Sequence, residues 1–435
     1  MKNATKWTAI GVALGVLLCG QPAVGQVPGA SPATLGTAQN YMVLARGYAA
    51  IGLNPAGLGM AGAEGFTLAL FPTQVSQSME PLGISAFLDY EGEVIPASVK
   101  EDWLQQITDA GGQTGTGTVE FTPIALSIDR LGIQFSTLAS ASTNLNPDVA
   151  ELLFFGNSGR TGTPGDFDLS GAQLTGYAVS TIAISLGFPL SRRWVPGVEQ
   201  GFAIGGTVKH SWGHALVHAE NREGILGADP VVGRIEFPMI YSSRDSDYWS
   251  GGSGLGLDVG VSWKRDSWAL AGVVQNLVNG FGWELREMSY RRGRIYVDRD
   301  SRQAIYEEWS GEFASEMMKD RVKDLTFNPT LSAGAAYSGF EDVTITAEIR
   351  QRTGDGLETG PKSHFGMGLQ YFATPTVPIY AGAAVITDGF QAGGGFGLTL
   401  GRVQVGASAL FRQGDVANSL LGMVGISVLG RRDGR

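Results

Sequence analysis

Three of the four histidines in the sequence are spaced four residues apart, at His210, His214 and His218. Imidazole nitrogen is a common zinc ligand, and on a helix this spacing would place the three rings on one face. The residues around them, however, alternate between apolar and polar types, as in a β-strand. Because a strand rises about 3.3 Å per residue, rings four residues apart would lie roughly 13 Å apart, too far to bind one ion. We therefore expect no metal site, and positions in an interfacial girdle or an outer loop instead.

Other residues that could support catalysis are scarce. The sequence has no His-Glu-x-x-His motif, nucleophile elbow or phosphate loop, and Gly254, Gly256 and Gly260 lack the strand-to-helix context of a dinucleotide loop. The single cysteine, Cys19, lies in a segment that we expect to be removed. The formal charge of −10 argues against nucleic acid as a partner. We expect a protein without catalytic residues and without a cofactor.

The dominant pattern of the chain is alternation with a period of two residues. Val343, Ile345, Ala347 and Ile349, for example, alternate with polar or charged residues. The alternating segments are long enough to cross a membrane, which takes roughly 9–11 residues of strand. The sequence therefore predicts an all-β fold, a closed transmembrane antiparallel β-barrel. We expect fourteen strands, at residues 82–90, 118–128, 131–141, 174–188, 201–219, 253–263, 268–278, 328–338, 342–352, 364–373, 378–386, 391–400, 402–411 and 418–429.

The connections between these segments alternate between short and long. If residues 418–429 run toward the periplasm, the short connections, such as 129–130 and 339–341, are periplasmic turns and the long ones are outer loops. Segment 66–75 is left over, either as a strand in the lumen or as the end of a plug.

Three of the outer loops contain helix signals. Ser98 with Glu101 forms a capping box that opens a helix to about residue 110, and Asn146 is an N-cap followed by a proline. Residues 301–324 are rich in charges and helix formers. We expect short helices at these places, which either cover the barrel mouth or only pack the loops.

The first 25 residues have the features of a secretory signal peptide. Lys2 and Lys6 precede an apolar run, and small residues at positions 23–25 form a cleavage site. We therefore divide the chain into a signal peptide at 1–25, an N-terminal segment at 26–65 and a barrel at 66–435.

Charged residues inside the strands are candidates for contact with a ligand. By the alternation, Lys209, Asp258, Glu348, Arg350 and Arg412 should point into the lumen, where barrel residues determine what passes. Such cations could bind the carboxylate of an amphipathic ligand by charge-assisted hydrogen bonds. Alternatively, they pair with lumen acids and only solvate the interior.

Two short motifs near the N-terminus carry a family resemblance. Leu-Ala-Arg-Gly at residues 44–47, which contains Arg46, is followed by Asn-Pro-Ala-Gly-Leu at residues 54–58. This pair resembles the start of FadL-like outer-membrane proteins, the superfamily of long-chain fatty acid transporters and of PorV-type secretion-system barrels. Further similarities, at residues 256–261, 274–277 and 329–337, extend over most of the mature chain. The closest branch is uncharacterised.

The resemblance implies a barrel of fourteen strands whose N-terminal hatch, residues 26–65, lies in the mouth or lumen. Arg46, Asn54, Pro55, Gly57 and Leu58 form the hatch motif. Asn54 before Pro55 is restricted to an extended or turn conformation, and Gly57 allows a tight backbone path. The motif either packs the N-terminal segment as a structural stop or contacts a ligand directly.

The function that the resemblance implies is passive passage of hydrophobic or amphipathic small molecules across the cell outer membrane, past the hatch. The alternative is a PorV-like scaffold that docks secreted or envelope proteins through its outer loops. Outer-membrane lipid is an expected partner in both cases. A soluble periplasmic β-protein is a third possibility, which the apolar outward faces of the segments disfavour.

Overall fold

The computed structural model describes residues 27–62, 65–156, 159–161, 166–190, 201–228, 231–243, 247, 249–297, 302–305, 307–357, 360–387, 389–414 and 418–429. The expected signal peptide at residues 1–25, with Cys19, lies outside the described residues. None of the helices in the described part of the chain is both long and apolar enough to span a membrane.

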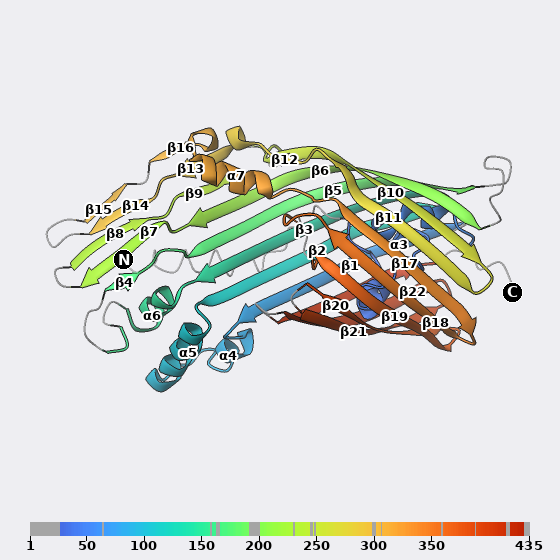
Figure 1. The fold of residues 1–435 in the computed structure, drawn as a ribbon, viewed down its shortest axis with the longest axis horizontal. Coiled ribbons are helices and arrows are strands. Elements are labelled where there is room, and N and C mark those ends of the chain that lie inside the picture. The colour runs from blue at the N-terminus through green and yellow to red at the C-terminus, as the bar shows by residue number, and fades with distance from the viewer. Residues whose placement is uncertain are drawn as a thin grey trace.

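Fourteen antiparallel strands form a closed barrel, as the alternation predicted (Figure 1). Each strand pairs with its neighbours in the barrel, and the first strand closes the barrel by pairing with the last, Ser78 opposite Ser419. The strands are β1 (Phe66–Glu80), β2 (Gln113–Ile128), β3 (Leu131–Leu145), β5 (Gln173–Leu190), β6 (Phe202–Glu220), β10 (Gly252–Arg265), β11 (Trp268–Asn279), β17 (Thr330–Phe340), β18 (Val343–Arg352), β19 (Ser363–Thr374), β20 (Val377–Ile386), β21 (Gly389–Leu400), β22 (Val403–Gly414) and β23 (Ser419–Val428).

The two faces of the barrel wall differ in polarity. Large apolar side chains at alternate positions, such as Val208, Leu255 and Val385, are exposed on the outside. The residues between them point inward and are buried, and many of them are polar or glycine. A closed barrel with an apolar outer surface is the architecture of outer-membrane proteins, because every backbone polar group is paired within the wall and lipid contacts only apolar atoms.

The expected strand at residues 82–90 is wrong. This stretch contains a short helix, α4 (Ile84–Leu88), and Leu82, Phe87 and Tyr90 pack on the same apolar cluster, around Trp103. The first strand of the barrel is instead β1, which includes the left-over segment 66–75. Pro72 interrupts the alternation there: the pairing of β1 with β23 shifts between Leu70 and Thr73, and residues 71–72 are left out of the pairing with β2. A proline is tolerated at such a bulge because the ladder is already broken there.

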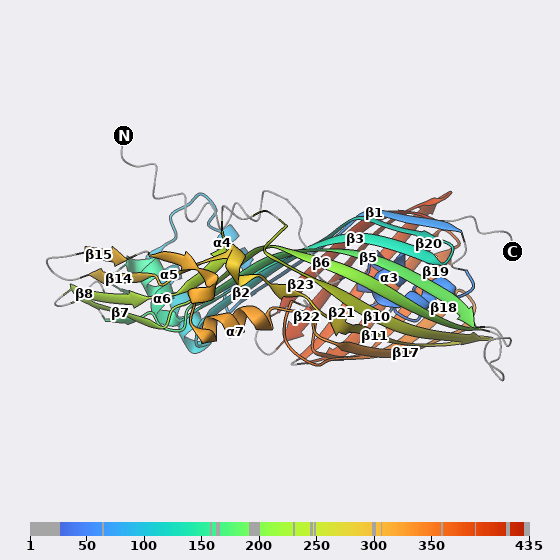
Figure 2. The same cartoon turned by 90° about the horizontal axis from the view of Figure 1, so that it is seen from above.

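The long inserts lie at one end of the barrel, as the connection lengths predicted, although the short connection between β20 and β21 lies there too. The turns β2–β3, β10–β11 and β17–β18 contain two residues each, whereas the inserts at the other end hold all the remaining sheet and most of the helices. Figures 1 and 2 show these inserts extending well beyond the barrel. We call the two ends the turn end and the insert end.

Two of the expected insert helices are present at about the expected place. The helix α5 (Ala97–Asp109) begins after Pro96, so Ser98 is not its N-cap, in contrast to the expected capping box. The helix α6 (Pro147–Phe155) is capped by Asn146, whose side chain accepts from the N–H of Val149, as predicted. In the third region the helical parts are the 3₁₀ helix η4 (Gly311–Phe313) and α7 (Glu316–Asp324), while residues before them form the short strands β15 (Arg302–Ile305) and β16 (Glu308–Ser310).

Additional short strands extend the barrel wall and form a second sheet at the insert end. β9 (Met239–Ser242), β12 (Gly282–Trp283), β13 (Met288–Arg291) and β16 continue the barrel sheet, while β4 (Phe167–Asp168), β7 (Glu223–Ala228), β8 (Val231–Glu236), β14 (Arg294–Val297) and β15 form the second sheet. A cluster of buried apolar residues, including Phe281, Trp283, Phe327 and Met318 of α7, packs together at the insert end.

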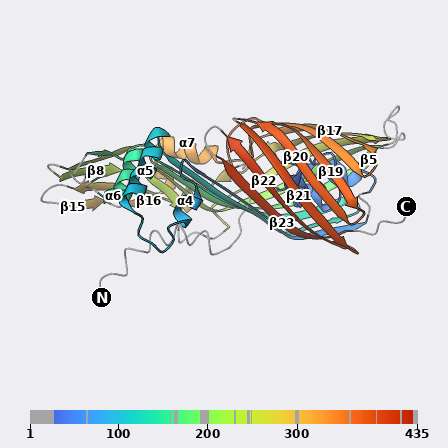
Figure 3. The ribbon, with the colours of Figure 1, turned by 90° about the horizontal axis from the view of Figure 1, so that it is seen from below.

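Residues 27–62, which we call the N-terminal segment, lie inside the barrel toward the turn end (Figures 2 and 3). They form two short helices, α2 (Pro32–Gly36) and α3 (Tyr48–Leu53), and the 3₁₀ helix η1 (Pro55–Gly59). Most of their side chains are buried, and they pack on inward-facing residues of strands from all around the wall.

Candidate functional site

The Asn-Pro-Ala-Gly-Leu motif packs on a row of three glycines in the wall. Gly187, Gly205 and Gly260 belong to β5, β6 and β10 and lie directly opposite one another across the strands. A Cβ on any of the three would meet an atom of residues 54–59 at a distance that real Cβ atoms essentially never show. The glycines therefore let the backbone of η1 approach the backbone of the wall.

A second row of glycines holds the other end of the N-terminal segment. Gly368, Gly382 and Gly393, on β19, β20 and β21, are also in register. A Cβ on Gly382 would overlap the carbonyl of Thr37, and a Cβ on Gly393 would lie 2.5 Å from the carbonyl oxygen of Leu35. Two of the glycine rows in the strands thus serve as packing sites for the N-terminal segment.

Asn54 joins the motif to the wall through hydrogen bonds. Its Nδ2 donates to the carbonyl of Val261 and to the hydroxyl of Ser262, both at 3.1 Å, while its Oδ1 accepts from the N–H of Ala56. The side chain is fully buried. Asn54 therefore connects the start of η1 to β10 and stabilises its first turn.

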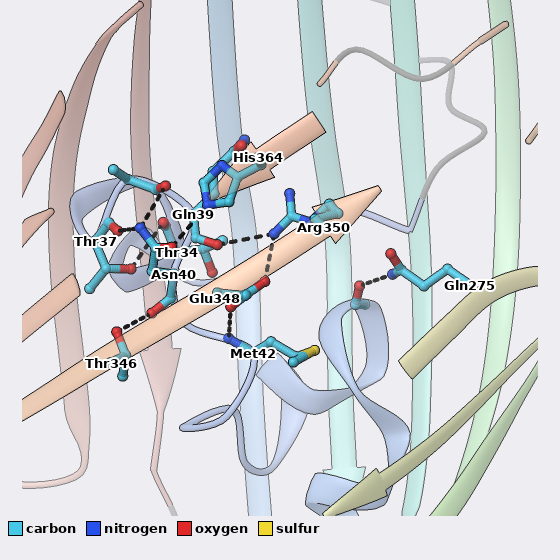
Figure 4. A network of polar contacts seen from close by, with 12 residues as sticks. Thr34, Thr37, Gln39, Asn40, Met42, Gln275, Thr346, Glu348, Arg350 and His364 are labelled. Carbon is cyan, nitrogen blue, oxygen red and sulfur yellow. Dashed lines mark hydrogen bonds and ion pairs between the residues drawn. The ribbon is translucent and has the colours of Figure 1, made fainter. Parts of the chain in front are cut away.

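An ion pair in the lumen holds the middle of the N-terminal segment (Figure 4). Glu348 accepts from the N–H of Met42 at 3.2 Å and from Arg350 at 2.8 Å. Arg350 also donates to the carbonyl oxygen of Gln39 at 3.0 Å. Both charges, which we expected inside the lumen, bind each other and the backbone of the segment.

A chain of neutral side chains continues this network. His364 bonds to Oδ1 of Asn40, whose Nδ2 donates to the carbonyl of Thr37, and Gln391 donates to the carbonyl of Ala38. Arg412 donates from Nε to Gln391 at 3.2 Å. Its Nη2 is buried and has no hydrogen-bond partner among the described residues. Among the five expected lumen charges, Arg412 is thus the cation that still has a hydrogen-bond donor, its Nη2, without a partner among the described residues.

The wall contacts the segment through side chains. Besides those named above, Gln134 donates to the carbonyl of Pro28, Gln275 to that of Gly52, and Thr346 to that of Asn40. Within the described ranges, no backbone–backbone hydrogen bond joins residues 27–62 to a barrel strand. The segment is therefore a separate body in the lumen and not part of the sheet.

The other two expected lumen charges form a second ion pair. Lys209 donates to Asp258 at 2.6 Å and to Oδ1 of Asn276 at 2.5 Å, and the N–H of Asn276 donates to Asp258 at 2.7 Å. Both charged side chains are nearly inaccessible. Asn276 has a positive φ of 54° at a bulge between β10 and β11, which turns its amide toward the pair. This arrangement matches our alternative of mutual pairing.

Arg46 of the motif faces the backbone of its own segment. Its Nη1 donates to the carbonyls of Val43 and Ala45, at 3.1 and 2.8 Å. Burial lowers the pKa of Arg46, and these carbonyls supply hydrogen bonds that replace part of its hydration. The contacts are those of a residue that shapes the segment.

The three spaced histidines do not come together. His210 contacts the ring of Trp212 edge to face, His214 contacts that of Trp249 edge to face and bonds to Ser180, and His218 bonds to Thr175. Among the residues that the structure describes, no group of three metal-ligating side chains could hold an ion.

The strand alternation placed the five lumen charges on the correct face but did not identify their partners. Asn40, His364, Gln391 and Asn276 were missed, although His364 and Gln391 also have inward parity in their strands; Asn276 points inward only because of the bulge. Nothing in the sequence indicated the role of Asn40, since its side chain donates to carbonyls that come close to it only when the N-terminal segment is folded.

Comparisons with known proteins concern both sequence and fold. A profile of the family described as "F plasmid transfer operon, TraF, protein" matches residues 96–349, more than half of the chain. No curated protein matches the sequence. Three solved structures share the fold over nearly the whole of both chains. A FadL homologue of Pseudomonas aeruginosa has 12% identity and a TM-score of 0.52, covering 94% of this chain and 100% of its own.

The other two are described as monoaromatic hydrocarbon channels. A TodX variant that lacks S2 and S3 has 11% identity and a TM-score of 0.55, covering 94% of this chain and 99% of its own. CymD has 12% identity and a TM-score of 0.55, covering 95% and 100%. At these identities the similarity shows a common fold, the FadL-type barrel that the N-terminal motifs suggested.

Proposed function

Because the chain belongs to the TraF family and has the FadL-type barrel fold, we propose that it lets hydrophobic or amphipathic small molecules diffuse across the outer membrane. Two of the proteins with this fold are described as hydrocarbon channels, and fold similarity alone is a weak warrant for a shared function. The proposal therefore depends on the lumen of this chain. We propose further that it is not an enzyme and that residues 1–25 direct its export.

The observation that carries the proposal is the way in which the N-terminal segment is held. Side chains such as Gln391, Arg350 and Asn54 attach it to the wall, and strand pairing does not. Side-chain hydrogen bonds contribute about 0.5–1.5 kcal/mol each, so part of the segment can detach while the wall keeps its ladder intact. We propose that the segment is a hatch that moves when a ligand passes.

Arg412 is our candidate for recognition of a polar head group. Lys209, Asp258, Glu348 and Arg350 form ion pairs with one another, whereas Arg412, which interacts electrostatically with Glu120, keeps a buried Nη2 with donors to offer. A carboxylate there would form a charge-assisted hydrogen bond. We therefore propose that the channel accepts amphipathic carboxylates as well as neutral hydrocarbons.

Uptake by cells that lack FadL-type channels tests both parts of this proposal. Cells expressing the protein should take up labelled toluene and a labelled long-chain carboxylate faster than cells with an empty vector. Arg412→Met should lower carboxylate uptake about tenfold, the effect of one lost charge-assisted bond, and leave toluene uptake unchanged. Arg402→Met, at an exposed turn, is the matched control. Uptake of both probes at the empty-vector rate would refute the channel.

The inserts support a second candidate function, a scaffold for secreted or envelope proteins. They extend beyond the barrel, have a core of their own around Trp103, and expose large apolar side chains that include Val94, Leu153 and Phe313. Exposed apolar side chains are common at protein interfaces. Purification in mild detergent distinguishes the two functions: a stoichiometric protein partner with no lipid-like ligand favours the scaffold, and the reverse favours the channel.

A further inference from the structure

An open groove is lined by residues of α4 and α5 and of the segment between them. Figure 1 shows these two helices outside the barrel, at the end away from α3. Its volume is about 370 Å³, within the range of small-molecule sites. Tyr90 and Trp103 form part of its lining, together with the carboxylates of Asp89 and Asp102 and the hydroxyl of Ser98.

The aromatic part of the groove is firmly positioned. Trp103 contacts Tyr90 edge to face at a centroid distance of 5.8 Å, and Phe87 and Phe154 pack on its other sides at 5.0 and 6.0 Å. The backbone N–H of Leu82 donates to Oε1 of Gln113, at the start of β2, and the carbonyl of Leu82 accepts from Nε2 of the same side chain. The groove is therefore part of a packed unit attached to the barrel.

The charges around the groove are of one sign. Asp89 and Asp102 are exposed, and Asp102 accepts one hydrogen bond, from Gln106 at 2.9 Å, which leaves its other oxygen available. Among the residues that the structure describes, no basic side chain lines the groove, and the one lysine between residues 81 and 112, Lys100, donates to the carbonyl of Phe154. The groove thus combines a negative potential with the half-buried ring of Tyr90, which packs on the buried Trp103.

Carboxylates beside aromatic rings are the chemistry that recognises an organic cation. The rings attract a positive charge through their quadrupoles and cover its apolar substituents, and the carboxylates neutralise it. We infer that the groove between α4 and α5 binds small organic ammonium ions with an apolar body. This site is independent of the proposed passage through the lumen.

Titration calorimetry of the full-length protein in a non-ionic detergent, with benzyltrimethylammonium as the probe, tests this inference. The wild type should bind one equivalent saturably, and neopentylbenzene, the uncharged isostere, should bind at least about tenfold more weakly. Asp89→Asn and Asp102→Asn should each weaken binding about threefold, and together about tenfold, as expected for exposed charge pairs. Glu101→Gln removes the same charge from the same helix outside the groove lining and should bind as the wild type does.

Two further variants examine the ring. Tyr90→Leu should weaken binding about threefold because it removes an aromatic face, whereas Tyr90→Phe should retain wild-type binding. Circular dichroism and heat-modifiable gel mobility identify any variant that fails to fold. If the double aspartate variant fails to fold, the two single aspartate variants still test the inference. Absence of saturable binding by the wild type, equal binding by the folded aspartate variants, or equal binding of the isostere would overturn the inference.

Discussion

Replacing Asn54 with alanine should free the N-terminal segment locally while the barrel stays folded. The substitution removes two donated bonds, to Val261 and Ser262, and the bond accepted from Ala56. Each such bond contributes about 1 kcal/mol net, and a buried group left unpaired adds to the loss. We therefore expect the free energy of local opening around η1 to fall by roughly 2–4 kcal/mol.

Hydrogen exchange followed by mass spectrometry measures this opening directly. Peptides that cover residues 48–60 should exchange about 30- to 1000-fold faster in Asn54→Ala than in the wild type, since every 1.4 kcal/mol is a factor of ten. Peptides from β10 should keep their protection, because the strand ladder does not depend on Asn54.

The chain offers a matched control in Asn279. Its Nδ2 also donates two bonds, to Thr326 and Phe327, and its Oδ1 accepts from Phe281, but all three partners lie at the insert end. Asn279→Ala should speed exchange there and leave residues 48–60 protected. Unchanged exchange of residues 48–60 in Asn54→Ala, or an equal effect of both variants on them, would refute the reasoning.

Three further predictions concern the lumen and the inserts. Lys209→Met should destabilise the protein in urea by about 3–5 kcal/mol because it leaves the Asp258 carboxylate buried and unpaired, and adding Asp258→Asn should restore much of this; no recovery would argue against the pairing. Gly205→Val should speed exchange of residues 54–59 by inserting a side chain against Pro55, whereas Gly206→Val, on the outer face, should not, and equal effects would contradict this packing site. Arg291 holds the pKa of Glu308 at about 2, so their contact is present at neutral pH and is lost as the pH falls toward 2. The effect of Glu308→Gln on exchange of residues 308–310 should accordingly shrink over that range, and an effect that is constant with pH would count against it.

The closed barrel could be predicted from sequence because alternation and connection length both depend on local pattern. The first strand could not, since Pro72 and the bulge around it break the alternation, while residues 82–90 imitate a strand although they pack at helical spacing on Trp103. A local pattern of apolar residues does not distinguish these cases until the packing partner is known.

The site was predictable in part for the same reason. Parity placed Lys209, Glu348 and Arg350 inside the lumen, where the structure has them. The contacts with the N-terminal segment depend on strand register and on the fold of that segment. Gln391 donates to the carbonyl of Ala38, and the two glycine rows form only when neighbouring strands are aligned. Such contacts between distant parts of the chain leave no signal in one sequence.

The central claim is that the N-terminal segment must move before a molecule can pass, and a disulfide tether tests it most directly. The Cβ of Thr37 lies 3.0 Å from the Cβ position of Gly368, so that a small adjustment would allow a Thr37→Cys, Gly368→Cys pair, with Cys19 replaced by serine, to bond. Uptake of toluene and of the long-chain carboxylate should be at least about tenfold lower in the oxidised double variant than in the same variant after reduction, and oxidation should not change uptake by either single-cysteine variant. Undiminished uptake through the oxidised, tethered protein would contradict the account.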